Sequence, residues 1–354
     1  MSKLKIGIIG VGHIAEIHIA SYLKNENVEL YAFCDINEER LKVKGEKYGV
    51  KHLYTDVNEM VKLEGLDAVS VCTWNCAHAK CSIAALNAGL NVLCEKPMCM
   101  NAIEAKEMLD AAEKSGKLLM IGFVRRYGND MEVLQDFIKT DFFGDFYYTK
   151  ATYLRRNGCP GGWFADSARS GGGPLIDLGV HVIDFVRYAL GNPKPISAYG
   201  ASFKKLGDRK DLKAIKDYCS DDAHEDVDCD VEDLAVAMIR FDNGAVLNVE
   251  ASFTLNIDKD RSNIELFGVK GGAKTEPELT LYSTANGYMT DVSLKAKTAL
   301  DFHGIFQREI DHYVDCLLGK CECRSPAVDG YELMKILDAV YESAKTGHEV
   351  IIEQ

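Results

Sequence analysis

The sequence lacks a long apolar run, since no stretch approaches the roughly 20 residues that a membrane-spanning helix needs. The apolar segment near the N-terminus is interrupted by Gly10, Gly12 and His13 before a signal-peptide core can form. We therefore expect a cytoplasmic protein with no membrane partner.

Basic residues are also in deficit, with 41 Lys and Arg against 54 Asp and Glu and a formal net charge of -13. Such a charge repels a phosphate backbone, so we expect no nucleic-acid partner. Prolines number seven in 354 residues and 47% of the residues are hydrophobic, which is typical of a folded globular protein.

Cysteines are plentiful, but the pair spacing of a metal or redox motif is missing. None of the twelve forms a CxxC pair, and Cys321 and Cys323 are too close together for one. Cys34, Cys72 and Cys94 each end an apolar run, which indicates buried thiols in a reducing compartment. We predict no metal site.

The chain is longer than one hydrophobic core usually serves, so two domains are expected. Up to Gly122, short apolar runs alternate with helical stretches of about a dozen residues, which predicts a doubly wound parallel sheet. After Phe123, long alternating runs and the turn Asp242-Asn243-Gly244 predict antiparallel strands. The predicted fold class is α/β, with a Rossmann domain over 1–122 and an α+β domain with an open mixed sheet over 123–354.

Two further features of the second domain are predicted. One long helix extends from Gly173 to Ala189, after a glycine run and Pro174. Residues 204–233 carry basic and then acidic side chains, which indicates an exposed excursion.

A dinucleotide fingerprint occupies the first turn, Gly10-Val11-Gly12-His13-Ile14-Ala15, between a predicted strand and helix. The first glycine makes the tight turn, the second lets the pyrophosphate approach, and the helix offers free N–H groups to it. Asp35 ends the second strand, where a carboxylate accepts hydrogen bonds from ribose hydroxyls and repels a 2′-phosphate. These residues predict NAD rather than NADP as the cofactor, the alternative for Asp35 being a solvated loop acid.

Three side chains are candidates for catalysis. Lys96 follows a strand in Glu95-Lys96-Pro97, where it can hydrogen-bond a substrate hydroxyl, although an ordinary surface turn has the same spacing. Asp177 and His181 are four residues apart on the predicted helix, so the carboxylate can orient an imidazole that carries a proton. A helix-surface ion pair is the alternative for this couple.

Taken together, the chain resembles the Gfo/Idh/MocA family of oxidoreductases over essentially its whole length. The carrying segments are the glycine turn, Thr73-Trp74-Asn75-Cys76-Ala77-His78, 85–97, 171–184 and 343–347. The resemblance implies that Lys96, Asp177 and His181 are a catalytic trio with His181 as general base. It also implies that Thr73, Asn75, His78 and Glu95 line the nicotinamide side of the crevice. Trp74 departs from the family's usual proline, and its ring could stack on the nicotinamide or on a sugar face.

The substrate is expected to be a carbohydrate or a cyclitol, with carbohydrate favoured. Aromatic and arginine side chains suit a polyhydroxylated ring. The candidates for the pocket wall are Arg125, Arg126, Tyr153, Arg155, Arg156 and Trp163.

The main hypothesis is reversible hydride transfer between NAD and a secondary hydroxyl. Two alternatives stay open: a glycoside-cleaving enzyme that oxidises transiently and recycles its bound NAD, and a dinucleotide-sensing protein without catalysis. The family resemblance also implies a homodimer or homotetramer assembled through the C-terminal sheet.

Overall fold

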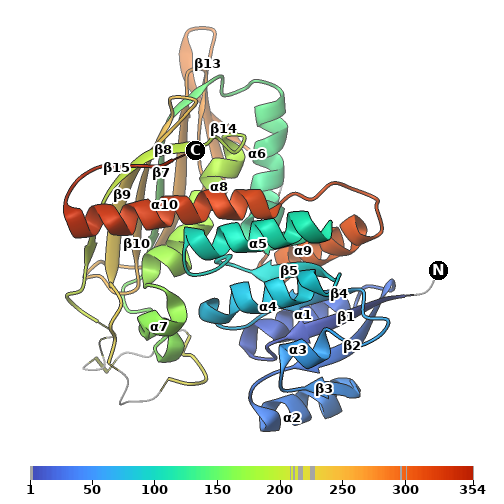
Figure 1. The fold of residues 1–354 in the computed structure, drawn as a ribbon. Coiled ribbons are helices and arrows are strands. Elements are labelled where there is room, and N and C mark those ends of the chain that lie inside the picture. The colour runs from blue at the N-terminus through green and yellow to red at the C-terminus, as the bar shows by residue number, and fades with distance from the viewer. Residues whose placement is uncertain are drawn as a thin grey trace. The chain divides into compact units, whose positions relative to one another are not determined.

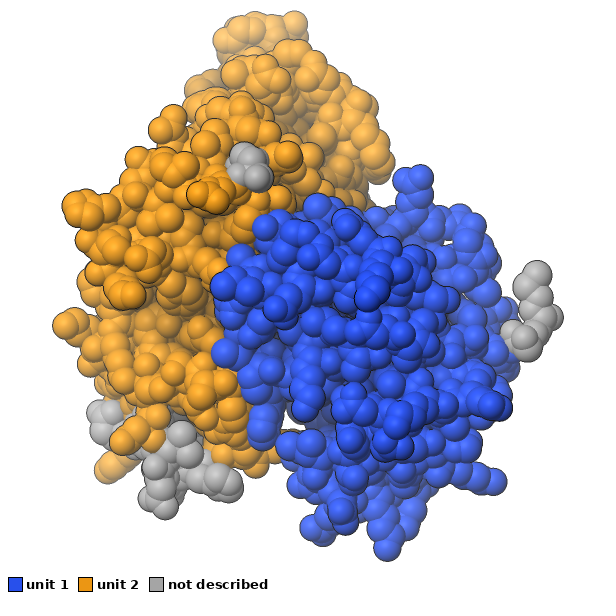
Figure 2. All heavy atoms as spheres, in the orientation of Figure 1, with its two compact units in different colours: residues 1–127, 302–331 blue, residues 128–301, 332–354 orange. Residues whose placement is uncertain are grey.

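The computed structural model describes residues 3–207, 209, 212–213, 218–223, 228–295, 297–299 and 301–353 (Figure 1). The chain forms two compact units, coloured separately in Figure 2: unit 1 is 1–127 with 302–331, and unit 2 is 128–301 with 332–354. Part of the charged stretch 204–233 lies outside the described residues. Within the described ranges, no helix has the length and apolarity needed to cross a bilayer.

Unit 1 is built on a six-stranded parallel sheet in the order β3-β2-β1-β4-β5-β6, which confirms the predicted Rossmann architecture. The order reverses beside the first strand, and in such sheets the ligand crevice lies at that switch point. The strands are β1 Leu4–Ile9, β2 Val28–Cys34, β3 His52–Tyr54, β4 Ala68–Val71, β5 Asn91–Glu95 and β6 Leu119–Gly122. The helices are α1 His13–Tyr22, α2 Glu38–Tyr48, α3 Val57–Met60, α4 Asn75–Asn87, α5 Ala102–Ser115, η1 Val124–Tyr127 and α9 Phe302–Leu317.

Helix α9 packs with unit 1, although the sequence-based division places its residues in the 123–354 domain. Its buried side chains recur on one face of the helix, at Ile305, Phe306, Ile310, Tyr313 and Val314. That face packs against α1 and joins the core of the Rossmann sheet. The apolar stripe therefore explains why 302–331 return to the N-terminal unit.

Unit 2 contains a nine-stranded mixed sheet in the order β14-β13-β12-β11-β7-β10-β9-β8-β15. Among the strands that the structure describes in this sheet, only β7 and β10 pair in parallel. The predicted hairpin at 242–244 is confirmed, with Gly244 at φ +85° between β9 and β10. The strands are β7 Phe146–Leu154, β8 Pro195–Phe203, β9 Leu234–Phe241, β10 Val246–Ser252, β11 Arg261–Gly268, β12 Gly272–Lys274, β13 Thr280–Ala285, β14 Tyr288–Ser293 and β15 Val350–Ile351.

The helical segments of unit 2 cover one face of this sheet, where α8 contacts β7, β10 and β11 (Figure 1). They are α6 Asn129–Lys139, η2 Gly162–Ala165, α7 Ser167–Ser170, η3 Leu175–Gly179 and α8 Val180–Ala189. Helix α10 (Ala327–Thr346) begins in unit 1 and ends in unit 2.

The single α-helix predicted over Gly173–Ala189 is wrong in one respect. Residues Leu175–Gly179 form a π-helical turn, and the regular helix α8 starts only at Val180. A π turn holds more residues than an α turn, so the spacing of Asp177 and His181 is not that of a regular helix face. Such turns occur often at functional sites.

Arg126 proves to be structural, since its side chain is buried in unit 1 with a relative exposure of 1%. Its guanidinium pairs with Asp329 at 2.7 Å and donates to the carbonyl oxygen of Arg324. This contact ties η1 to the first turn of α10.

Replacing Arg126 by Met should lower the free energy of unfolding by about 3–5 kcal/mol, because it takes the cationic partner from a buried carboxylate. Lys62→Met is the control, since Lys62 pairs with Glu59 at 2.7 Å where both side chains are more than half exposed. That change should cost about 0–1 kcal/mol. Urea unfolding of the two variants measures both values, and equal losses would contradict the structural role of Arg126.

Candidate active site

The glycine turn has the geometry that a dinucleotide requires. Gly10 has φ +83°, and a Cβ there would lie 2.6 Å from the carbonyl oxygen of Cys72. Gly12 precedes α1 without a side-chain cap, and α1 begins at His13 with Ile14 in its first turn. The first-turn N–H groups of an uncapped helix favour phosphate, so the turn fits the pyrophosphate of NAD.

Asp35 is not a solvated loop acid, because it is 6% exposed. One carboxylate oxygen accepts from the Val11 N–H at 2.8 Å, and the other accepts from the Asn37 N–H at 2.8 Å. The Arg40 guanidinium lies 3.7 Å from the first oxygen. The carboxylate is thus held rigidly against the glycine turn.

The segment Thr73–His78 forms the start of α4, with Trp74 as its N-cap and Asn75 buried. The two ring nitrogens of His78 lie 2.7 Å from the Pro97 carbonyl oxygen and 3.0 Å from the Thr73 carbonyl oxygen. Burial lowers the pKa of His78, against the opposing effect of these two carbonyl contacts. This side chain connects the turn after β4 to the turn that carries Lys96.

Glu95 is buried, and its carboxylate lies 2.8 Å from His18 Nε2 on α1. Its other oxygen accepts from the Lys96 N–H at 3.1 Å. Burial acts to raise the pKa of Glu95, but the hydrogen bond from His18 and the nearby positive charges outweigh burial and lower it. His18 was not anticipated here, because the pairing depends on how α1 packs.

Lys96 is half-buried, while each of the other residues from Val92 to Cys99 is buried. The half-buried Lys96 follows the carboxyl end of β5, and its backbone N–H is fixed by Glu95. The surface-turn alternative for Lys96 does not fit this environment.

Asp177 and His181 show the same pattern in unit 2. Every other residue from Gly172 to Arg187 is buried, whereas these two are half-buried. A helix-surface ion pair would stand on an exposed helix face, which this segment lacks. The π turn and the first turn of α8 therefore present one carboxylate and one imidazole from an otherwise buried segment.

Glu232 holds the start of this segment and was not anticipated. Its carboxylate accepts from the N–H groups of Gly173 at 2.8 Å and Leu175 at 3.2 Å, and from the Tyr341 hydroxyl at 2.9 Å. Burial raises the pKa of Glu232. A Cβ on Gly173 would lie 2.2 Å from the Glu232 carbonyl oxygen, which explains that glycine.

Two of the arginine candidates, Arg155 and Arg156, lie in different surroundings. Arg155 is close to Asp177 and Tyr153: burial acts to lower its pKa, but the charges of those two groups outweigh burial and raise it. Arg156 is exposed, and it bonds instead to the carbonyl oxygen of Asp258 through its guanidinium and to Asp260 through its N–H. Arg155 is thus the arginine beside the candidate catalytic residues of unit 2.

Residues 218–223 of the stretch 204–233 pack on the loop that carries Trp163, whereas 204–205 and 212–213 are exposed, as an excursion predicts. Asp222 accepts from the Trp163 N–H at 3.2 Å and pairs with Arg169 at 2.5 Å. Tyr218 stacks edge-on against Phe164, and burial together with the charges of Asp221 and Asp177 raises its pKa. Tyr218 is therefore a further aromatic group near Asp177.

The candidate residues are divided between the two units. The glycine turn, Asp35, Thr73–His78, Glu95, Lys96 and Arg125 belong to unit 1, and Tyr153, Arg156, Trp163, Asp177 and His181 belong to unit 2. Unit 1 supplies a dinucleotide cradle with an amine, and unit 2 supplies a carboxylate with an imidazole.

Comparison with known families assigns both units. Residues 4–123 match the NAD-binding Rossmann fold of the Gfo/Idh/MocA oxidoreductases, and residues 136–352 match the C-terminal α/β domain of the same family. This chain belongs to the Gfo/Idh/MocA family. The predicted fold class, cofactor and NAD-dependent oxidoreductase function are confirmed.

Several relatives are similar over most of the chain. D-glucoside 3-dehydrogenase of Escherichia coli K12 is 34% identical over 99% of this chain and 97% of its own length. Myo-inositol 2-dehydrogenase of Thermotoga maritima is 30% identical over 76% of this chain and 74% of its own. Among solved structures, levoglucosan dehydrogenase in complex with NADH shares the fold with a TM-score of 0.86, 22% identity and full coverage of both chains.

Gly10→Ala should abolish measurable NADH binding, because the new Cβ collides with the Cys72 backbone. Gly49→Ala is the matched control: it has φ +70°, yet its Cβ would meet nothing within 4 Å. Both variants should lose about 1 kcal/mol of stability from the left-handed backbone. NADH fluorescence titration separates them, and equal NADH affinity in the two variants would contradict the role of Gly10.

Proposed function

We propose that this chain oxidises a secondary ring hydroxyl of a sugar or glycoside, with Lys96, Asp177 and His181 as its catalytic residues. The observation that carries the proposal is the pattern of exposure. In 92–99 and in 172–187, the residues that reach solvent are the amine, the carboxylate and the imidazole that proton transfer needs.

Each residue has a distinct role in this scheme. When bound, NAD accepts the hydride from the hydroxyl-bearing carbon. His181 takes the hydroxyl proton, Asp177 orients the ring and stabilises its charged form, and the Lys96 ammonium stabilises the developing alkoxide. The reverse steps reduce the ketone.

The cofactor is held in this scheme by unit 1. The glycine turn with His13 and Ile14 would bind the pyrophosphate, and Thr73, Trp74 and Asn75 would line the nicotinamide side. Asp35 would accept from the adenosine ribose hydroxyls and repel a 2′-phosphate, which favours NAD over NADP. His78 and Glu95 are buried in hydrogen bonds, so we assign them to positioning the Lys96 turn.

The substrate class rests on unit 2 and on the relatives. Arg155 and Tyr218 lie near Asp177, and Tyr153 packs under the Arg155 guanidinium; such aromatic and cationic groups suit a polyhydroxylated ring. D-glucoside 3-dehydrogenase, which is 34% identical over 99% of this chain, acts on a D-glucoside, and this favours a glycoside over a cyclitol. Arg125, Arg156 and Trp163 remain candidates for the outer wall.

Lys96→Met should lower kcat by about 100-fold or more, because the alkoxide loses its cationic partner, while NADH affinity is retained. Lys106→Met is the control, since Lys106 pairs with Asp110 at the exposed surface of α5, and its activity should be unchanged. NADH absorbance over a panel of glucosides, free sugars and inositols measures both variants.

The same assay separates the other functions. No NADH and no NAD binding would contradict the proposal. Cleavage of a glucoside without net NADH would establish cofactor recycling instead, and full activity of Lys96→Met would remove Lys96 from the mechanism.

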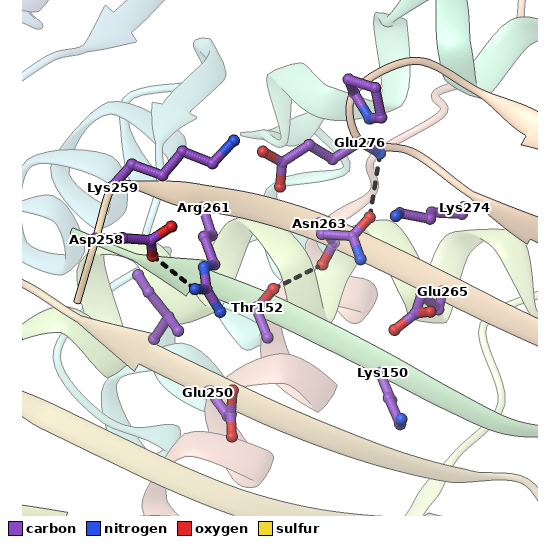
Figure 3. A pocket seen from close by; sticks show the side chains of 12 residues that line it. Lys150, Thr152, Glu250, Asp258, Lys259, Arg261, Asn263, Glu265, Lys274 and Glu276 are labelled. Carbon is purple, nitrogen blue, oxygen red and sulfur yellow. Dashed lines mark hydrogen bonds and ion pairs between the residues drawn. The ribbon is translucent and has the colours of Figure 1, made fainter. Parts of the chain in front are cut away.

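We also place a subunit interface on the uncovered face of the nine-stranded sheet. Neighbouring strands align Tyr199, Met238, Asn248, Lys150 and Glu265 in one row. Tyr199 and Met238 are 53% and 48% exposed. A cavity of about 500 Å³ lies on this face. Figure 3 shows that side chains of both charges line it, including Lys150, Lys274, Glu250 and Glu265. A two-fold axis can bring such opposite charges together in a homodimer or homotetramer.

Met238→Asp should shift the protein toward the monomer, because it buries a carboxylate in that interface. Ile103→Asp is the control, since Ile103 is 75% exposed on α5, which belongs to unit 1. Sedimentation velocity at several concentrations measures the change. A wild-type monomer, or equal effects of both variants, would contradict this interface.

A further inference from the structure

A thiol cluster lies at the end of α9. Cys34, Cys72 and Cys94 are buried as predicted, but Cys321 is exposed and Cys316 is half-buried. Their sulfur atoms are 3.6 Å apart. The Cys316–Cys321 spacing is not that of a CxxC motif.

The turn after α9 brings the two thiols together. Gly319 adopts φ +70°, and its N–H donates to the Cys316 carbonyl oxygen at 3.0 Å. The Lys320 N–H donates to the Asp315 carbonyl oxygen at 2.9 Å. A left-handed residue just after a helix reverses the chain, so Cys321 returns over the last turn of α9.

One imidazole touches both thiols. His312 Nδ1 lies 3.6 Å from Cys321 Sγ, and Nε2 lies 3.4 Å from Cys316 Sγ. The Arg324 backbone N–H donates to Nε2 at 3.0 Å, so this nitrogen is an acceptor. Burial and the charge of Arg324 lower the pKa of His312, and the neutral ring then carries its proton on Nδ1.

This arrangement gives the two sulfurs different roles. The Nδ1–H faces Cys321, where it stabilises the negative charge of an attacking sulfur. Burial, first of all, and the hydrogen bond with Cys321 raise the pKa of Cys316, which favours its protonated form. The geometry fits a nucleophilic thiol at the surface with a second thiol behind it.

We infer that Cys321 and Cys316 form a dithiol site for exchange with low-molecular-weight disulfides, in which Cys321 attacks first and Cys316 closes an intramolecular disulfide. A metal ion fits less well, although His312, Cys316 and Cys321 place ligand atoms within 4.8 Å of one another. A metal-bound histidine usually donates from its second nitrogen, whereas here a backbone N–H points at Nε2.

The exchange balances in two steps. Cys321 loses its proton to water and its sulfur attacks one sulfur of the small disulfide, whose S–S bond breaks to release a thiolate that takes up a proton. Cys316 then loses its proton and attacks the Cys321 sulfur, releasing the second small thiol. The protein loses two electrons and two protons, and the small disulfide gains both as two thiols.

The test uses the reduced full-length protein and oxidised glutathione, with acid quenching, alkylation and tryptic peptide mapping. Cleavage after Lys320 separates the two cysteines, so the disulfide appears as a linked peptide pair that dithiothreitol releases. Cys316→Ser should instead retain glutathione on Cys321. Cys321→Ser should lose the linked pair, and His312→Phe should slow its formation by about tenfold.

Two controls address specificity. Cys323→Ser should keep the linked pair, and Cys219→Ser, at an exposed cysteine of unit 2, should leave its rate unchanged. Glutathione on Cys76 or Cys219 as fast as on Cys321 would overturn the inference. So would one equivalent of zinc in the purified wild type that is absent from Cys321→Ser, which would make the cluster a metal site.

Discussion

The arrangement of the strand ends in unit 1 depends on the hydrogen bond from the Val11 N–H to the buried Asp35 carboxylate. This bond joins the end of β2 to the turn after β1, and the Cys72 N–H at the end of β4 donates to the Ile9 carbonyl oxygen at the end of β1 at 2.7 Å. His78 continues from Thr73 to Pro97, beside Lys96. The ends of four neighbouring strands are thus connected by short polar contacts.

In unit 2, hydrogen bonds of Glu232 position the segment that carries Asp177 and His181. The Glu232 carboxylate accepts hydrogen bonds from the backbone N–H groups at the start of the π turn. It also accepts one from the Tyr341 hydroxyl on α10. A buried carboxylate with three donors is stable only while all three remain in place. The positions of Asp177 and His181 therefore depend on Glu232, which comes 51 residues after His181 in the chain.

The sequence predicted those features that have local signals. The glycine turn, the positions of Asp35 and Lys96 directly after their strands, and the 242–244 hairpin each depend on a few adjacent residues and on strand order, so the pattern sufficed. The return of α9, the π turn, the His18–Glu95 pair and the contact of Tyr218 with Phe164 depend on packing between distant segments. Arg155 and Arg156 show the same limit: one residue decides which guanidinium faces Asp177, and strand pleating settles it only in three dimensions.

The discontinuity of unit 1 has a consequence for how the protein is made. The first 127 residues leave the ribosome about 175 residues before α9 follows, since α9 begins at residue 302. At 5–20 residues per second, that interval is on the order of 10–40 seconds. During that time, the apolar side chains of α1 that α9 will cover face water or a chaperone. The nascent Rossmann sheet thus lacks α9 during that interval. Truncated chains that end before residue 302 are expected to aggregate, because those apolar side chains stay exposed.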